Sequence, residues 1–155
     1  LIMKKYLLLL TLFLVIGCEK EPTNIEMLNE KDEVYYTKDT NKPYSGRVVS
    51  FYENGQKNWE GNLKDGKEDG LWNWWYENGI KKYIQGTFKD GNQVGLWTIW
   101  YENGQKSENG TFKNGEMDGL WTYYYKRGQK EGEMTFKNGK LISKKQWNED
   151  GSVKK

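Results

Sequence analysis

Aromatic side chains are the residues in this sequence whose types and spacing favour molecular recognition. Eight tryptophans and eleven tyrosines occur among 155 residues, and all the tryptophans lie between Trp59 and Trp147. Exposed aromatic rings stack on sugars, fill pockets of a protein partner or lie at a membrane interface. These aromatics therefore either form a binding surface or pack against one another as the core of the sheet.

Catalytic groups are poorly represented by comparison. The sequence has no histidine and one cysteine, which excludes Ser/His/Asp and Cys/His nucleophiles and histidine-bound metals. Two carboxylates can hydrolyse a glycosidic bond, but Glu53, Glu77 and Glu102 recur once per repeat beside a turn glycine. A residue repeated in this way is structural, and no calcium-loop spacing occurs. We expect no enzyme activity, no metal and no cofactor.

The N-terminal segment has the pattern of a bacterial export signal. Lys4 and Lys5 precede an apolar run from Tyr6 to Ile16, which is shorter than the roughly 20 residues that a membrane-spanning helix needs. The following Gly17 and Cys18 complete a sequence that resembles the lipobox of bacterial lipoproteins. This resemblance implies cleavage of residues 1–17 and lipidation of Cys18. The alternative is a plain signal peptide with a chance cysteine.

The charge balance argues against nucleic acid as a partner. The formal net charge is +2, and removal of Lys4 and Lys5 leaves 22 basic side chains against 22 acidic ones. Residues 18–33 are rich in Glu, Lys and Asn and are predicted to form a flexible tether behind the lipid. Since Glu19 is not the aspartate that marks inner-membrane retention in some bacteria, we expect the outer membrane or the cell surface.

Residues 34–151 form a tandem repeat with a period of about 24 residues. Tyr-Glu-Asn-Gly, Lys-Asp/Asn-Gly and Gly-Leu-Trp recur in alternation, with three full units between two atypical ones; residues 152–155 are predicted to be a tail. The glycines expected at structural turns are Gly55, Gly66, Gly79, Gly91, Gly104, Gly115, Gly128 and Gly139. Asn-Gly and Asp-Gly between alternating apolar runs predict β-hairpins with type I′ turns.

The segments between these turns predict strands with two distinct faces. Leu96 to Tyr101 is mostly β-branched or aromatic, and period-2 alternation places Trp97, Ile99 and Tyr101 on one face. Leu96, Thr98 and Trp100 lie on the other. Leu63, Phe88, Phe112 and Phe136 form a further column on the return strands. The fold class is therefore all-β, as a single-layer, twisted antiparallel meander of hairpins.

The repeated residues resemble those of the MORN (membrane occupation and recognition nexus) repeat. Gly-Leu-Trp-x-x-Trp-Tyr-Glu-Asn-Gly-Gln-Lys followed by Gly-Thr-Phe-Lys-Asn/Asp-Gly is most similar to the bacterial variant found in proteins labelled YwqK-type antitoxins. The resemblance implies an aromatic-lined groove used for interactions, without an active site. Departures include Met134, which replaces the glycine of Gly61, Gly86 and Gly110.

The sequence thus predicts a non-enzymatic, lipid-anchored module of the bacterial cell envelope that binds a protein through its aromatic face. The candidate contact residues are Trp72, Trp74, Tyr76, Trp97, Tyr101, Trp121 and Tyr123. A glycan or cell-wall ligand is the alternative, because regularly spaced aromatics match a repeating polymer. Toxin neutralisation is a minor alternative, since an exported lipoprotein fits poorly with a cytoplasmic toxin.

Overall fold

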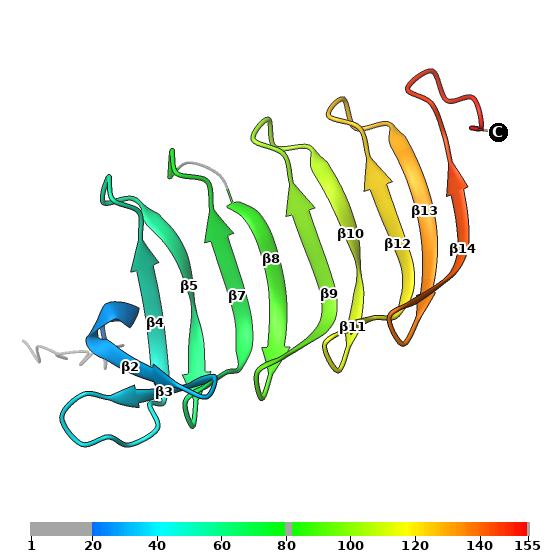
Figure 1. Cartoon of the computed structure of the whole chain (residues 1–155). Helices are drawn as coiled ribbons and strands as arrows, with labels where there is room; N and C mark the ends of the chain where they lie inside the picture. The colour runs from blue at the N-terminus through cyan, green and yellow to red at the C-terminus, as the bar shows by residue number, and fades with distance from the viewer. Residues whose placement is uncertain (1–19, 80–81, 155) are drawn as a thin grey trace, which may run out of the picture.

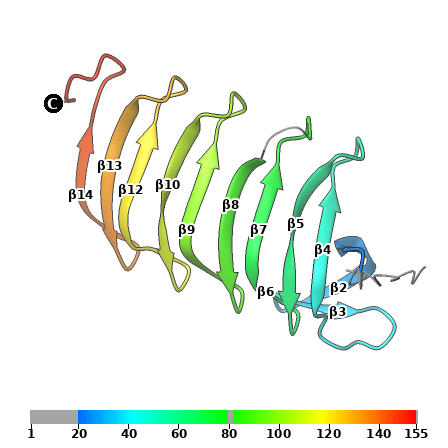
Figure 2. The same ribbon diagram turned by 180° about the vertical axis from the view of Figure 1, so that it is seen from behind.

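The computed structural model describes residues 20–79 and 82–154 and shows one long sheet whose strands lie side by side (Figure 1). The sheet has 12 strands, and its path is β1-β4-β5-β7-β8-β9-β10-β12-β13-β14. Seen from behind, the ribbon is again a single layer (Figure 2). The predicted all-β meander of tandem hairpins is therefore confirmed. The signal peptide and Cys18 lie outside the described residues.

Each repeat contributes an outgoing strand and a return strand. The outgoing strands are β4 (Gly46–Phe51), β7 (Gly70–Trp75), β9 (Asn92–Trp100) and β12 (Gly119–Tyr124). The return strands are β5 (Lys57–Lys64), β8 (Lys82–Lys89), β10 (Lys106–Lys113) and β13 (Lys130–Lys137). β14 (Lys140–Gln146) closes the array, while β6 (Lys67–Glu68) and β11 (Glu116–Met117) are short extensions beside β5 and β10.

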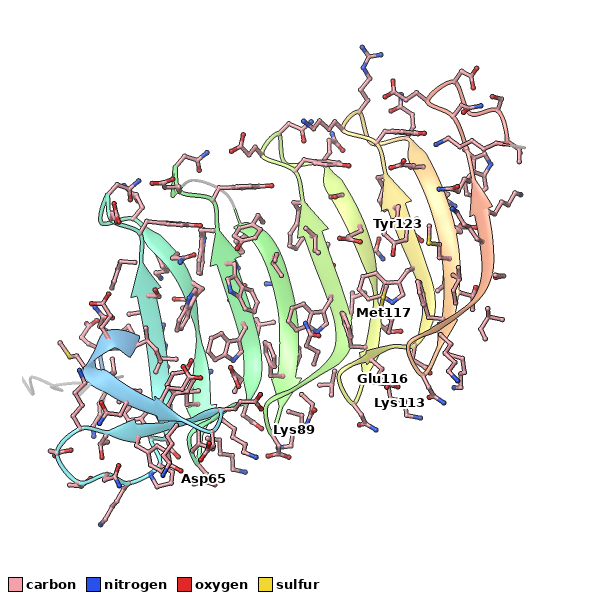
Figure 3. The ribbon with its side chains drawn as sticks, viewed as in Figure 1. Asp65, Lys89, Lys113, Glu116, Met117 and Tyr123 are labelled. Atoms are coloured by element: carbon pink, nitrogen blue, oxygen red, sulfur yellow. The ribbon has the colours of Figure 1, made fainter. Side chains whose placement is uncertain are left out.

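The two edges of the sheet use different turns. At one edge Asp65, Asp90, Asn114 and Asn138 have φ values of 48–53° and each precedes a positive-φ glycine, as a type I′ turn requires. Asp65, Lys89, Lys113 and Glu116 mark this edge in Figure 3. All eight glycines expected at turns have positive φ values, from 69° to 89°.

The Tyr-Glu-Asn-Gly edge differs from the type I′ prediction. Only the glycine of Tyr52-Glu53-Asn54-Gly55 has a positive φ, and the Gly55 N–H donates to the Tyr52 carbonyl. The Asn54 carboxamide oxygen accepts from the Gln56 N–H at 2.9 Å, which supports Asn54 without left-handed backbone. This is a three-residue loop with a glycine bulge. A register shift follows in every hairpin, for example between Trp74 and Trp75, and such bulges increase strand twist.

The segment predicted as a flexible tether is ordered from β1 onward. β1 (Thr23–Asn24) pairs in parallel with Val48 and Val49, and η1 (Ile25–Met27) follows. β2 (Leu28–Lys31) then pairs with β3 (Val34–Thr37) in a separate two-stranded sheet. Ile25 and Leu28 pack against the core cluster of Val48, Leu63 and Trp72, in which Val48 occupies the position that later units give to tryptophan. Residues 23–31, within the segment predicted as a tether, therefore form β1, η1 and β2, and apolar side chains of this segment contact the core.

The C-terminal segment turns back on the sheet instead of trailing away. Val153 forms a bridge with Trp147, and the Lys154 N–H donates to the Gln146 carbonyl at 2.9 Å. The predicted tail therefore extends the last hairpin as far as the structure describes it.

Candidate functional site

Glycines on the return strands allow tryptophans to lie flat against the sheet. A Cβ atom built on Gly61, Gly86 or Gly110 would lie 2.1–2.2 Å from the indole of Trp72, Trp97 or Trp121 respectively. These three tryptophans are only 3–5% exposed. Because real Cβ contacts are longer than 3.0 Å, any side chain at these positions would displace the ring. Each glycine is thus the platform for the tryptophan of the following unit.

Met134 supports this interpretation by its position. It occupies the platform position of the last return strand, opposite Trp121 in the register. The strand that follows it, β14, has the sequence Lys-Leu-Ile-Ser-Lys-Lys-Gln and contains no tryptophan. The glycine is therefore replaced where no ring needs the space.

The three buried tryptophans and three partly buried rings form a continuous aromatic ladder across the units. Successive ring centroids are 5.1–5.7 Å apart. The ladder runs Trp59, Trp72, Phe88, Trp97, Phe112 and Trp121. Four of its five contacts are edge-to-face pairs with interplanar angles of 69–86°, the geometry that the ring quadrupoles favour. The ladder is the main core of this single-layer sheet.

Tyrosines at the loop edge tie each repeat to the next. The hydroxyl of Tyr76 donates to the Trp100 carbonyl and that of Tyr101 to the Tyr124 carbonyl, both at 2.7 Å. Tyr52 and Tyr125 make the equivalent bonds to Trp75 and Trp147. The side-chain amides of Asn54 and Asn103 also donate to carbonyls of the next loop. These residues therefore hold neighbouring hairpins in register.

Replacing Tyr101 by phenylalanine is expected to destabilise the protein by about 1 kcal/mol, because it removes one hydrogen bond and leaves the Tyr124 carbonyl without it. Urea unfolding followed by tryptophan fluorescence measures the change. Tyr124→Phe is the matched control, since no hydrogen bond of the Tyr124 hydroxyl occurs within the described residues. An equal loss of stability in both variants would remove the proposed role of the tyrosine hydroxyls.

A second row of side chains crosses the strands on the same face as the ladder. The register pairs its members in sequence, so each side chain has its neighbours on the adjoining strands. We call this the contact row: Trp59, Trp74, Ile84, Ile99, Glu108, Tyr123 and Gly132. Apart from the buried Gly132, its residues are partly exposed, unlike Trp72, Trp97 and Trp121 on the same face, and Trp59 belongs to both the ladder and the row. The row is therefore the accessible part of the aromatic face.

Glu108 is the one charged member of the contact row. It occupies the position of Trp59 and Ile84 and lies between Ile99 and Tyr123. It borders a hollow of about 360 Å³ that is mainly apolar; Met117 and Tyr123 mark it on β11 and β12 in Figure 3. Within residues 20–79 and 82–154 no basic side chain forms an ion pair with Glu108. Burial raises the pKa of the Glu108 carboxyl above its ordinary value.

The raised pKa of Glu108 has a consequence for stability. A carboxyl whose pKa is higher in the folded state stabilises the fold below its unfolded pKa, and that contribution is lost as pH rises through the folded pKa. Glu108→Gln is therefore expected to be more stable than the parent protein at pH 7 and equally stable at pH 3. Urea unfolding at the two pH values measures this difference. If the stability difference between Glu108→Gln and the parent protein were the same at pH 3 and pH 7, the account would be contradicted.

The opposite face has a hollow of about 330 Å³ beside Trp100, Tyr124 and Lys106, and this hollow is less apolar than the one at Glu108. The most exposed apolar residues of this face, Leu71, Leu96 and Leu120, each face a threonine on the return strand. They recur once per repeat, two strands or roughly 10 Å apart, so they are scattered single residues. Trp75 on this face is covered by the ammonium groups of Lys57 and Lys82, at 4.9 and 5.6 Å from its ring.

The structure divides the seven candidate contact residues into three groups. Trp72, Trp97 and Trp121 are buried in the aromatic ladder and have little surface to offer a partner. Tyr76 and Tyr101 are partly exposed, with hydroxyls committed to the next repeat. Trp74 and Tyr123 lie in the contact row. A binding role for all seven stays a prediction.

Five members of the row were absent from the sequence candidates: Trp59, Ile84, Ile99, Glu108 and Gly132. Glu108 has a signal in the sequence, since it is an acid where equivalent positions hold tryptophan or isoleucine. Ile84 and Ile99 have no such signal in the sequence, because they belong to the row only through their neighbours on adjacent strands.

The described residues contain neither a cluster of metal ligands nor a membrane-spanning helix. In residues 20–79 and 82–154, no three or more His, Cys, Asp or Glu side chains are grouped so as to hold a metal ion. Across the same residues, no helix has the length and apolarity to cross a bilayer.

Tandem β-hairpins with recurring turn and aromatic positions define a repeat protein whose units bury their core against one another. A family model described as MORN repeat variant matches residues 68–90, 93–114 and 117–138. These segments are the three full units, from β6 to the end of β13. Comparison with curated proteins gives no match. These three segments are therefore similar to MORN repeat variants, and repeats of this kind suggest a binding module.

Proposed function

We propose that this protein is a non-enzymatic module of the bacterial cell envelope that binds a protein partner through the contact row. The observation that carries the proposal is the contrast in burial between two rows of side chains on this face. Trp72, Trp97 and Trp121 are buried. Trp74, Ile99 and Tyr123, two residues further along the same strands, instead form a partly exposed row with Ile84. A contiguous, partly apolar strip that no other part of the described chain covers is typical of an interaction surface.

A protein ligand fits this row better than a glycan. Carbohydrate platforms present broad ring faces, whereas the most regular rings here are buried and packed edge-to-face. The accessible row mixes aromatic, branched aliphatic and carboxylate side chains, as protein interfaces do. Quenching of tryptophan fluorescence by a cell-wall or surface polysaccharide, lost in a Trp74→Ala variant, would favour the glycan instead.

A crosslinking pull-down from envelopes tests the protein partner. The parent protein is compared with Trp74→Ala/Tyr123→Ala, which alters the contact row, and with Leu71→Ala/Leu96→Ala, which alters the opposite face. We expect one protein to be captured by the parent and by the leucine variant but not by the row variant. Equal capture by all three proteins would refute the assignment of the face.

Membrane anchoring through Cys18 is the second part of the proposal. It rests on the lysines, apolar run, Gly17 and Cys18 in succession, which resemble a lipoprotein signal. Acyl chains contribute about 0.8 kcal/mol per buried methylene, so several chains hold a protein at a membrane. The parent protein is expected to enter the detergent phase in Triton X-114 separation and Cys18→Ser the aqueous phase. Detergent partitioning by Cys18→Ser would exclude lipidation. The YwqK-type antitoxin label gains support only if the captured partner is a toxin.

A further inference from the structure

Glu108 stands out as a polar interruption of an otherwise uncharged row. Every other member of the contact row is tryptophan, isoleucine, tyrosine or glycine. The units on its N-terminal side place Trp59 and Ile84 at the same position, so the fold does not require an acid there. An acid at a site that accepts apolar residues loses hydration without gaining a structural partner.

The surroundings of Glu108 have the chemistry of a cation receptor. The hollow beside it is lined mainly by Ile84, Trp97, Ile99, Phe112, Trp121 and Tyr123. Glu108 pairs with Tyr123 across β10 and β12 and with Ile99 across β10 and β9, so its carboxylate is flanked by a ring and an aliphatic side chain. Cations are attracted both to a carboxylate and to the faces of aromatic rings.

Arginine matches this site better than lysine does. Its guanidinium is planar, stacks on aromatic rings, donates two parallel hydrogen bonds to a carboxylate and is more weakly hydrated than an ammonium. The last property matters because a site that already desolvates its own carboxylate also has to desolvate the incoming cation.

We propose that the hollow at Glu108 receives an arginine side chain of the partner protein, with the guanidinium paired to the carboxylate beside Tyr123. This proposal rests on the proposed function, because it names the chemistry by which the contact row recognises its protein partner. The remaining row, Trp74 and Ile84 above all, then contacts apolar residues of the same partner segment.

Panning a random peptide library against the full chain in detergent micelles tests the proposal. The same library is panned against Glu108→Gln, which removes only the charge, and against Glu108→Ile, which restores the residue of the preceding unit. Glu133→Gln is the matched control, since Glu133 lies on β13 on the opposite face and pairs with Lys130. We expect arginine to be enriched at one position by the parent protein and by Glu133→Gln, and by neither Glu108 variant.

A selected peptide then permits a two-sided measurement of affinity. Replacing its arginine by citrulline, a neutral isostere, is expected to weaken binding to the parent protein about tenfold or more, the loss typical of a hydrogen bond to a charged group. The same replacement is expected to leave binding to Glu108→Gln almost unchanged. If citrulline weakened binding equally to both proteins, the arginine site would be overturned. Selected peptides without enriched arginine would also overturn it. Neither result would contradict the proposed binding face. Failure to select any peptide with the parent protein would count against both proposals.

Discussion

Replacing Gly86 by valine is expected to destabilise the sheet by about 3 kcal/mol, the upper part of the usual range for overpacked sites. The new Cβ would lie 2.1 Å from Cδ2 of Trp97. The indole cannot easily move away, because Phe88 and Phe112 hold it at ring-centroid distances of 5.2 and 5.6 Å. Its Nε1–H also donates to the Thr87 carbonyl at 3.3 Å. Chemical unfolding followed by circular dichroism measures the loss.

Gly132→Ala is the matched control for this substitution. Gly132 is also a buried return-strand glycine, but the nearest atom to an added Cβ is the Lys145 carbonyl oxygen at 3.5 Å, an ordinary contact. Its φ is not positive, so alanine is expected to change stability by less than about 1 kcal/mol, in the stabilising direction. Similar losses in Gly86→Val and Gly132→Ala would show that no ring platform exists at Gly86.

Removing the ring itself is expected to have the second large effect. Trp97→Ala deletes a side chain that is 5% exposed and contacts Trp74, Phe88 and Phe112. Truncation of a buried tryptophan typically costs about 3–5 kcal/mol, from lost burial and the remaining cavity. Equilibrium unfolding in urea measures this change, and a loss below about 1 kcal/mol would contradict the assignment of Trp97 to the core.

The two substitutions are also expected to be coupled. With Trp97 absent, the space over Gly86 is free, so the valine side chain fills part of the cavity. The double variant Gly86→Val/Trp97→Ala should therefore lose less stability than the sum of the single losses. Additive losses would mean that the two residues do not share one site.

The repeat and its turns were predictable from the sequence because each depends on local chemistry. Asp90-Gly91 and Asn114-Gly115 adopt the left-handed backbone that these residue types favour. The alternation of Trp97 with Thr98 likewise places their side chains on opposite faces.

Depth within a face was not predictable in the same way. Trp72 and Trp74 share a face, yet Trp72 is buried and Trp74 is partly exposed. The difference arises because Trp72 lies over Gly61, whereas Trp74 meets Trp59 and Ile84 on the neighbouring strands. The register between strands determines how deeply each side chain is buried. The alternation of residues along one strand does not predict that register.

The N-terminal segment shows a second limit. Ile25 and Leu28 lie in a stretch whose composition is typical of a tether, yet they pack against a cluster of Val48, Leu63 and Trp72 further along the chain. A local composition test cannot recognise a long-range contact of two side chains.

The central claim is that a partner binds the face carrying the contact row. Tyr123 and Tyr124 test it most directly, because they are consecutive residues of β12 with opposite orientations and similar partial exposure. A benzophenone amino acid at position 123 should photocrosslink the envelope partner, whereas the same group at position 124 should not. Crosslinking from position 124 alone, or equally from both positions, would contradict the account.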